Sequence, residues 1–253
     1  MEMFEKLRQL KELRTKMDEL KSLIDAHRAQ EPCTAIIVEP RRHRALPFVL
    51  RNILENLNSN WSVRIFHGTS NQKFLEELLA GELLPLAPRI FLENLGVENL
   101  PTPRDYSEIL TSRKFTEAIP TETFLVFQTD SMINPRYRDL LATFLTYDYV
   151  GAPWANGGVG NGGFSLRKRS KMLEIIDSAP PYAGEYEDTF YSNATKVQLN
   201  KPPAELAALF SMETVYTAVS FGVHRAWKYH PKKLEEMCRN CPGLETLISL
   251  QEE

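Results

Sequence analysis

The residues best suited to chemistry in this chain are a carboxylate after a short apolar run, an acidic pair and a late histidine. Asp130 follows residues 124–127, which have the length and composition of a buried strand. Open α/β sheets bind ligands at the carboxyl ends of their strands, where Asp130 is expected to lie. Glu187 and Asp188 begin an expected helix, and His224 lies among apolar residues. Each also has a structural alternative, since strand-end and helix-start carboxylates often act as caps and a lone histidine is often structural.

Five glycines fall within seven positions: Gly157, Gly158, Gly160, Gly162 and Gly163. No Lys-Ser or Lys-Thr pair follows the last of them, so this is not a P-loop, and the spacing is not G-x-G-x-x-G. The run predicts close approach of the backbone to a ligand, and a plain flexible loop is the alternative. A second loop, residues 39–44, is rich in arginine and follows the first expected strand.

Apolar runs alternate with amphipathic segments along the chain. Residues 34–38, 62–68 and 124–127 have the composition of strands, and helical patterns separate them, one beginning near Asn71. This alternation predicts an α/β fold with a mostly parallel sheet flanked by helices. A further helix is expected over residues 105–119, whereas residues 81–104 follow no clear pattern.

The composition is that of an ordinary soluble globular protein. The 253 residues are 25% charged and 43% hydrophobic, with a net charge of −3 and a pI near 6.0. These values argue against wholesale nucleic-acid binding, and no apolar run is long enough for a membrane span. The N-terminus is charged from Glu2 onward, unlike a signal peptide. Cys33, Cys238 and Cys241 are expected to be reduced structural thiols of a cytoplasmic protein, since one C-x-x-C is weak evidence for zinc.

Residues 1–30 are predicted to be a separate unit. Apolar residues recur there at alternating spacings of three and four: Leu10, Leu13, Met17, Leu20 and Ile24. This heptad pattern predicts an N-terminal coiled-coil helix that makes the protein a homo-oligomer. An amphipathic helix packed on its own domain is the alternative. The remaining residues, 31–253, are then the α/β domain.

The order of these elements resembles the GT-A fold of nucleotide-sugar-dependent glycosyltransferases. The segments FQTDS, YVGAPW, GVGNGGFSLR, YEDTFYS and FGVH are similar to those of an uncharacterised glycosyltransferase-like domain family, over residues from about 34 to 229. The resemblance implies a GT-A, Rossmann-like sheet. It also implies an enzyme that transfers a sugar, with inversion, from a nucleoside-diphosphate sugar to a hydroxyl of a glycan or other acceptor.

The same resemblance implies roles for the reactive residues. GT-A enzymes end a central strand with a D-x-D motif that holds a divalent cation, and here Gln128 replaces the first carboxylate while Asp130 keeps the last. Asp130 and His224 are then the protein ligands of a Mn²⁺ or Mg²⁺ ion shared with the donor diphosphate. Asp188 is the base that deprotonates the acceptor hydroxyl, and Glu187 positions it.

Further residues are assigned to the substrates. Those expected to bind the donor are Glu39, Arg41, Arg42, Asp130, Gly162, Gly163 and Arg167. The arginines among them are candidates to neutralise the diphosphate if the metal is weakly bound, since arginine binds phosphate in a bidentate way. Trp154 offers an apolar face to the acceptor sugar or packs in the core.

Two other functions stay open on the sequence. A non-catalytic carbohydrate-binding or assembly protein on a degenerate GT-A fold is favoured by the missing first carboxylate of D-x-D. Retention of Asp130, Glu187, Asp188 and His224 together opposes it. A sugar-nucleotide pyrophosphorylase shares a related sheet, but such enzymes carry a glycine-rich signature after the first strand, and residues 39–44 include no glycine.

Removal of residues 1–30 is expected to reduce the protein to a smaller species, because a helix of this length is marginal without a partner. Light scattering of the full chain and of the shortened chain measures the change. An equal number of subunits in both proteins would show that the helix packs on its own domain instead.

Overall fold

The computed structural model describes residues 11, 14–16, 32–180 and 182–251. The chain divides into two units, Met1–Glu31 and Pro32–Glu253. The apolar positions of the predicted coiled coil, from Leu10 to Ile24, lie outside the described residues. The coiled coil and the homo-oligomer therefore stay predictions.

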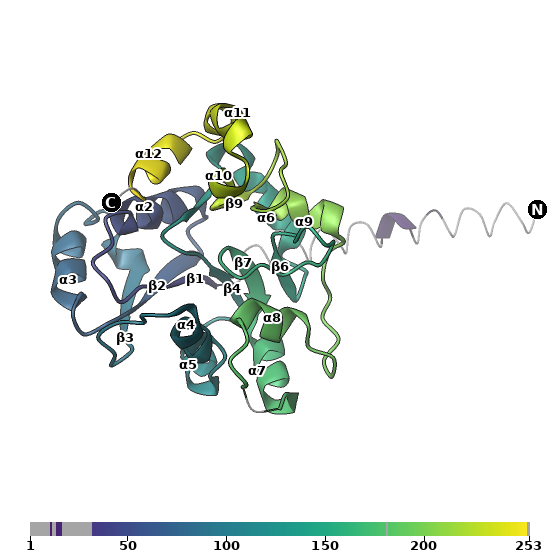
Figure 1. Ribbon diagram of the computed structural model, residues 1–253, viewed down its shortest axis with the longest axis horizontal. Coiled ribbons are helices and arrows are strands. Elements are labelled where there is room, and N and C mark those ends of the chain that lie inside the picture. The colour runs from purple at the N-terminus through teal and green to yellow at the C-terminus, as the bar shows by residue number, and fades with distance from the viewer. Residues whose placement is uncertain (1–10, 12–13, 17–31, 181, 252–253) are drawn as a thin grey trace, which may run out of the picture. The chain divides into compact units, whose positions relative to one another are not determined.

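A six-stranded sheet with helices on both faces forms the centre of the second unit (Figure 1). The strand order is β3-β2-β1-β4-β7-β6. Strand β1 pairs in parallel with β2 and β4, and β2 pairs in parallel with β3. Strand β7 runs antiparallel to both of its neighbours, β4 and β6, so it alone is reversed. The predicted mixed, mostly parallel α/β sheet flanked by helices is confirmed.

The strands of the large sheet are β1 Cys33–Val38, β2 Trp61–His67, β3 Ile90–Asn94, β4 Thr123–Val126, β6 Tyr149–Gly151 and β7 Ser165–Lys168. Those of a second, three-stranded sheet are β5 Ser131–Ile133, β8 Ser211–Met212 and β9 Gly222–His224. The helices are α2 Leu46–Asn56, α3 Gln72–Ala80, α4 Pro103–Leu110, α5 Arg113–Ala118, α6 Leu141–Phe144, α7 Arg169–Ser178, α8 Glu187–Ser192, α9 Ala204–Phe210, α10 Ala226–Tyr229, α11 Leu234–Asn240 and α12 Leu244–Ser249, with 3-10 turns at Ala87–Arg89, Pro135–Leu140 and Pro231–Lys233.

The large sheet is buried on both faces because its central strands are apolar at successive positions. In β1, Ala35 and Ile37 face a core shared with α2, α9 and α12, whereas Ile36 and Val38 face a core shared with α4, α5, α7 and α8. Figure 1 shows these two groups of helices on opposite sides of the sheet. Side chains of successive strand residues point to opposite faces, so an unbroken apolar run is what a doubly covered strand requires.

The second sheet carries the late histidine to the end of β4. Strand β5 follows β4 after a tight turn and pairs antiparallel with β9, with Ser131 opposite His224. Asp130 therefore lies beside the residue that follows His224. Asn52 of α2 fixes β5 from the other side, because its side-chain amide donates to the carbonyl of Ile133 (3.0 Å) and accepts from the Ile133 N–H (2.8 Å).

Two parts of the fold differ from the sequence prediction. Residues 90–94, which follow no clear pattern in the sequence, form the edge strand β3, where Phe91 is 49% exposed. An edge strand covered on few sides does not need a continuous apolar run. The single helix predicted over residues 105–119 is two helices, because the helical conformation ends after α4 and begins again at α5. The Ser112 hydroxyl caps α5 by accepting a hydrogen bond from the Phe115 N–H (3.2 Å).

In the part of the chain that the structure describes, each helix is too short or too polar to cross a membrane. No disulfide joins the three cysteines. Burial, with a contribution from Cys238, raises the pKa of the Cys241 thiol to about 12, as expected of an unreactive thiol.

Candidate active site

Asp130 ends the turn between β4 and β5. The turn is fixed by the Ser131 hydroxyl, which donates to the carbonyl of Gln128 and accepts from its N–H, both at 2.9 Å. One carboxylate oxygen of Asp130 lies 3.4 Å from His224 Nε2, and the other lies 3.3 Å from Arg225 Nε. Burial raises the pKa of Asp130, but His224 and Arg225 outweigh it and hold the pKa below its ordinary value. Asp130 is therefore an anion between two cationic groups.

The imidazole of His224 is buried and lies between two carboxylates. Its Nδ1 is 3.2 Å from Glu213 Oε1 and 3.0 Å from Asn161 Oδ1, while Nε2 faces Asp130. Burial lowers the pKa of His224, but Asp130 and Glu213 outweigh it and raise the pKa to about 9. In the absence of a metal ion, the ring therefore carries a positive charge at neutral pH.

The end of the glycine loop joins this histidine to the acidic pair. A Cβ on Gly162 would lie 2.0 Å from Glu187 Oε1, and a Cβ on Gly163 would lie 2.1 Å from His224 Cε1. The close approach predicted from the glycines is therefore, at these two positions, an approach to the protein's own side chains. Only glycine leaves room there for the histidine and the acidic pair to be placed together.

Arg167 and Glu187 form a buried ion pair beneath this loop. Arg167 Nη1 lies 2.8 Å from Glu187 Oε2, with side-chain exposures of 2% and 6%. Its Nε donates to the Ser165 hydroxyl (2.9 Å), and the guanidinium lies 4.9 Å from the ring centre of Tyr149. Burial raises the pKa of Glu187 above its ordinary value, although Arg167 opposes the shift. The guanidinium is thus already paired, and a direct contact of Arg167 with a donor would have to compete with Glu187.

Asp188 lies at the start of α8, half-buried, one residue beyond Glu187. Its Oδ1 accepts from the N–H of Thr189 (2.7 Å), and its Oδ2 lies 3.4 Å from the N–H of Gly162. One oxygen is therefore held by the helix backbone, while the other faces the glycine loop. The two carboxylates of the acidic pair have different surroundings, because Glu187 is buried in an ion pair with Arg167 whereas Asp188 is half-buried.

The loop after β1 lies within electrostatic reach of Asp130. Glu39 is buried and holds Arg41 with two hydrogen bonds of 2.8 Å, from Nε and Nη2 of the arginine. The pKa of Arg41 is raised first by Glu39 and to a smaller extent by Asp130. Arg42 is exposed and makes no hydrogen bond or ion pair with the described residues. Asn71, expected to cap α3, instead donates its side-chain N–H groups to the carbonyls of Glu39 (2.8 Å) and Arg41 (3.0 Å).

Trp154 stands at the base of a short hairpin. Its N–H donates to the carbonyl of Gly158 (2.8 Å), and a Cβ on Gly158 would lie 2.9 Å from the indole ring. The side chain is half-buried. This position is compatible with an acceptor contact and with a purely structural role, so the acceptor-binding role stays a prediction.

Four residues of the site were not predicted. Glu213, Asn161 and Arg225 contact His224 or Asp130 directly. The hydroxyl of Tyr106, on α4, is buried, and burial together with the charge of Glu187 raises the pKa of this tyrosine above its ordinary value. Glu213 directly follows β8, so the strand-end argument made for Asp130 would have found it had that short strand been recognised. Tyr106 has no signal in the sequence.

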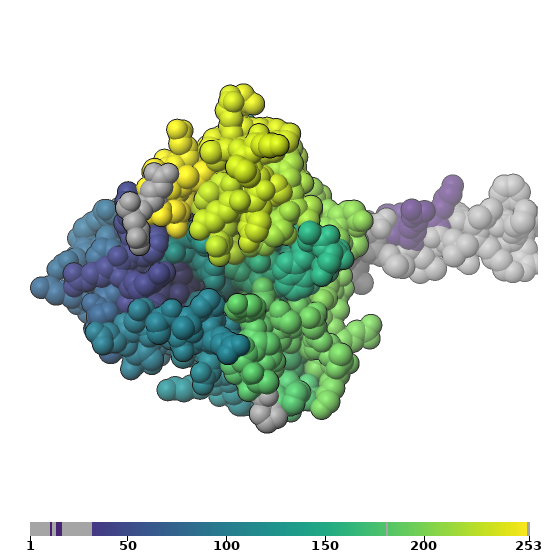
Figure 2. Space-filling view, in the orientation of Figure 1, coloured from purple at the N-terminus to yellow at the C-terminus, as the bar shows by residue number. Residues whose placement is uncertain are grey.

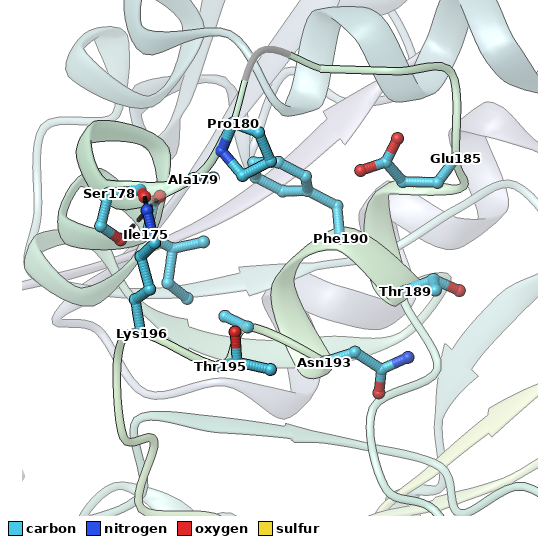
Figure 3. A pocket seen from close by; sticks show the side chains of 11 residues that line it. Ile175, Ser178, Ala179, Pro180, Glu185, Thr189, Phe190, Asn193, Thr195 and Lys196 are labelled. Carbon is cyan, nitrogen blue, oxygen red and sulfur yellow. Dashed lines mark hydrogen bonds between the residues drawn. The ribbon is translucent and has the colours of Figure 1, made fainter.

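The surface near these strand ends is hollowed. Figure 2 shows a recess between the blue-to-teal first half of the unit and the yellow C-terminal segment. A separate cavity of about 330 Å³ lies between α7 and α8 and is lined by Ile175, Phe190, Asn193 and Lys196 among others (Figure 3). None of the predicted site residues is among the described residues that line this cavity, so the predicted chemistry does not belong there.

The predicted metal ion needs several ligands in one place. Among the described residues, no group of three or more His, Cys, Asp or Glu side chains is arranged to hold a metal. Asp130 Oδ1 and His224 Nε2 are nevertheless both buried, and both lack a well-directed hydrogen-bond partner. Their separation of 3.4 Å suits two neighbouring ligands of one octahedral ion. The pair fits a divalent ion that takes its remaining ligands from a substrate and water.

Fold and site together define a mixed α/β protein with a polar cluster at the carboxyl end of β4. Residues 89–224, more than half of the chain, match the family described as "Protein of unknown function (DUF5672)", and the chain belongs to that family. The matched range includes Asp130, the glycine loop, the acidic pair and His224.

Several solved structures are distantly similar. They include HddC from Yersinia pseudotuberculosis (10% identity, 67% of this chain and 88% of that chain, TM-score 0.44). The glycosyltransferase GlyE from Streptococcus pneumoniae TIGR4 has 10% identity over 77% of this chain and 54% of that chain (TM-score 0.49). The mannosyltransferase PcManGT from Pyrobaculum calidifontis, in complex with GDP-Man and Mn²⁺, has 15% identity over 68% of this chain and 55% of that chain (TM-score 0.47). Likeness this distant carries no argument about the reaction. No curated protein matches the chain.

Replacing Arg167 with methionine is expected to destabilise the fold by about 3–5 kcal/mol, because Glu187 is then buried without its partner. The R167M/E187M double variant removes both charges and should recover most of the loss. Urea unfolding of both single variants and the double variant gives the coupling between the two side chains.

The loss in R167M should also depend on pH. Without Arg167, the folded-state pKa of Glu187 rises further above its unfolded value of about 4.3. A raised folded-state pKa favours the fold at pH values below the unfolded pKa, and that benefit disappears as the pH rises through the folded pKa. The free energy of unfolding of R167M should therefore fall relative to that of the double variant as the pH rises above the unfolded pKa of Glu187. If the difference in free energy of unfolding between R167M and the double variant does not change with pH, Glu187 is not the group that Arg167 keeps charged.

Proposed function

We propose that the chain is a nucleotide-sugar-dependent glycosyltransferase that transfers a sugar, with inversion, from a nucleoside-diphosphate sugar to a hydroxyl of a glycan or other acceptor. The proposal rests on the polar cluster at the end of β4. There, Asp130, His224 and Arg225 lie on one side of Gly162 and Gly163, and the acidic pair lies on the other.

The observation that carries the proposal is the gathering of buried polar atoms that lack a well-directed hydrogen bond in this cluster. These atoms are Tyr106 Oη, Asp130 Oδ1, His224 Nε2 and Arg225 Nε, although Asp130 forms ion pairs with His224 (3.4 Å) and Arg225 (3.3 Å). Buried charged groups are costly to desolvate, and an ion pair with poor hydrogen-bond geometry offsets only part of that cost. Their concentration beside Asp130 and the glycine loop supports a site built for a polar, charged ligand. A sugar diphosphate is such a ligand.

The charges of the cluster suit departure of a diphosphate. Asp130 and His224 are the residues that would hold a Mn²⁺ or Mg²⁺ ion, which when bound neutralises charge on the leaving diphosphate. Glu213 and Asn161 orient the imidazole through Nδ1, leaving Nε2 directed at Asp130. Glu39 and Arg41 form the opposite side of the donor site in this proposal, with Arg42 available to solvent-facing phosphate or ribose oxygens.

Asp188 is proposed as the base. A sugar hydroxyl is a poor nucleophile at neutral pH, so attack on the anomeric carbon is helped when a carboxylate accepts its proton. Asp188 keeps one oxygen toward the glycine loop, whereas Glu187 is buried on Arg167. Glu187 is therefore proposed to position Asp188 and the loop, with Trp154 as a platform for the acceptor sugar.

One observation favours the rival function of a non-catalytic carbohydrate-binding or assembly protein. The described residues offer only two metal ligands at the site, and Gln128 stands where a first carboxylate would supply another. A binding protein would keep affinity for the donor and lack turnover, which makes the two functions separable by experiment.

Asp188→Asn is expected to lower the transfer rate by about 10²–10⁴-fold while donor binding and melting temperature stay near those of the wild type. A thermal-shift screen of nucleotide sugars, with and without Mn²⁺, first identifies the donor, because ligands that bind the native state raise the melting temperature. Transfer is then measured per folded molecule.

Asp105→Asn is the matched control. Asp105 also lies in the first turn of a helix, where it accepts from the N–H of Thr102 (2.9 Å), but it is outside the site. D105N should cost about 0.3–1 kcal/mol of stability, because it removes a negative charge from the helix start, and should leave turnover unchanged. If D188N behaves like D105N, Asp188 only caps its helix. If the wild type binds a nucleotide sugar and neither transfers nor hydrolyses it, the rival function is correct.

A further inference from the structure

Arg225 is the only non-glycine residue with a positive φ in the part of the chain that the structure describes. Its φ of 50° and ψ of 14° lie in the left-handed region, which L-residues other than glycine, asparagine and aspartate rarely adopt. Residues held in such conformations concentrate at functional sites, where the surrounding structure imposes them. The left-handed conformation therefore marks Arg225 as a candidate functional residue.

The backbone of Arg225 is fixed by the second sheet. Its N–H donates to the carbonyl of Asp130 (3.1 Å), one residue beyond the β5–β9 pair of Ser131 and His224. This hydrogen bond extends the ladder to the last residue of the turn after β4. Arg225 is thus held directly beside Asp130, whatever its side chain contacts.

The side chain of Arg225 is directed at the same carboxylate and is only partly used. Its Nε lies 3.3 Å from Asp130 Oδ2, and 40% of the side chain is exposed. Its terminal nitrogens make no hydrogen bond with the described residues. Arg167, by contrast, is buried in an ion pair with Glu187, and Arg41 donates two hydrogen bonds to Glu39. Arg225 therefore combines contact with Asp130 and unused donors open to solvent.

We propose that Arg225 is an anion-binding residue of this site and that its terminal nitrogens hold a phosphate oxygen of the donor diphosphate. The inference rests on the proposed function and extends it to a residue that the motifs leave out. A guanidinium is always charged and offers parallel N–H donors that match a phosphate. With Arg225 in place, part of the diphosphate affinity is independent of a divalent ion.

Calorimetry with inorganic pyrophosphate as the probe tests this on the full chain, once with Mn²⁺ and once with EDTA. Loss of one charge-assisted contact to a phosphate corresponds to roughly a tenfold to hundredfold weaker affinity. We expect Arg225→Gln to weaken binding by that factor in both conditions, and Arg225→Lys, which keeps the charge and loses the fork, to weaken it less. Arg64→Gln is the matched control, because Arg64 is also a half-buried arginine paired with a carboxylate, Glu93 at 2.8 Å, outside the site.

Arg225→Gly separates binding from folding. Glycine adopts the left-handed region without strain, so R225G should melt above R225Q while showing the same loss of affinity. Equal pyrophosphate affinity in the wild type and R225Q, with binding lost in Asp130→Asn, would overturn the role of Arg225 and leave the proposed donor site standing. No binding of pyrophosphate by the wild type in either condition would overturn both.

Discussion

The ion pair of Arg167 and Glu187 is the interaction on which the arrangement of the site depends. Arg167 belongs to β7 and Glu187 begins α8, so the pair ties that helix to the central sheet at the level of the glycine loop. A buried pair is expensive to desolvate, and breaking it costs more than it contributes when intact. The pair therefore acts less as a source of stability than as a constraint on where α8, and with it Asp188, can lie.

The glycine loop brings the acidic pair and the histidine together in one site. Gly162 lies against Glu187 and Gly163 against His224, at distances that leave no room for a side chain. The acidic pair, carried by α8, and the histidine, carried by the second sheet, meet only across these two residues. His224 is in turn positioned by Glu213 and faces Asp130, so charges of opposite sign alternate through the cluster. Such an arrangement can bind an anion beside Arg225 and keep a carboxylate available on the other side.

The fold class could be predicted from the sequence because the central strands need uninterrupted apolar runs, as residues 34–38 and 124–127 show. The edge strand β3 could not, since few of its residues are buried. Asp130 and His224 lie 3.4 Å apart, and their role as metal ligands stays a prediction. The state of Arg167, however, depends on a tertiary partner twenty positions away, and a cationic residue in a sequence does not show whether its charge is already paired. Arg225 was missed for a related reason: its conformation comes from the β5–β9 pairing, which short strands leave almost unmarked in the sequence.

The central claim is that this cluster, and no other part of the described chain, receives a diphosphate. The most direct test is a crystal structure of the full chain with Mn²⁺ and inorganic pyrophosphate, with anomalous data collected at the manganese edge. We expect pyrophosphate beside Arg225 and an anomalous peak within ligand distance of Asp130 Oδ1 and His224 Nε2. Pyrophosphate bound elsewhere, with Asp130 and His224 still in contact and no manganese between them, would contradict the claim.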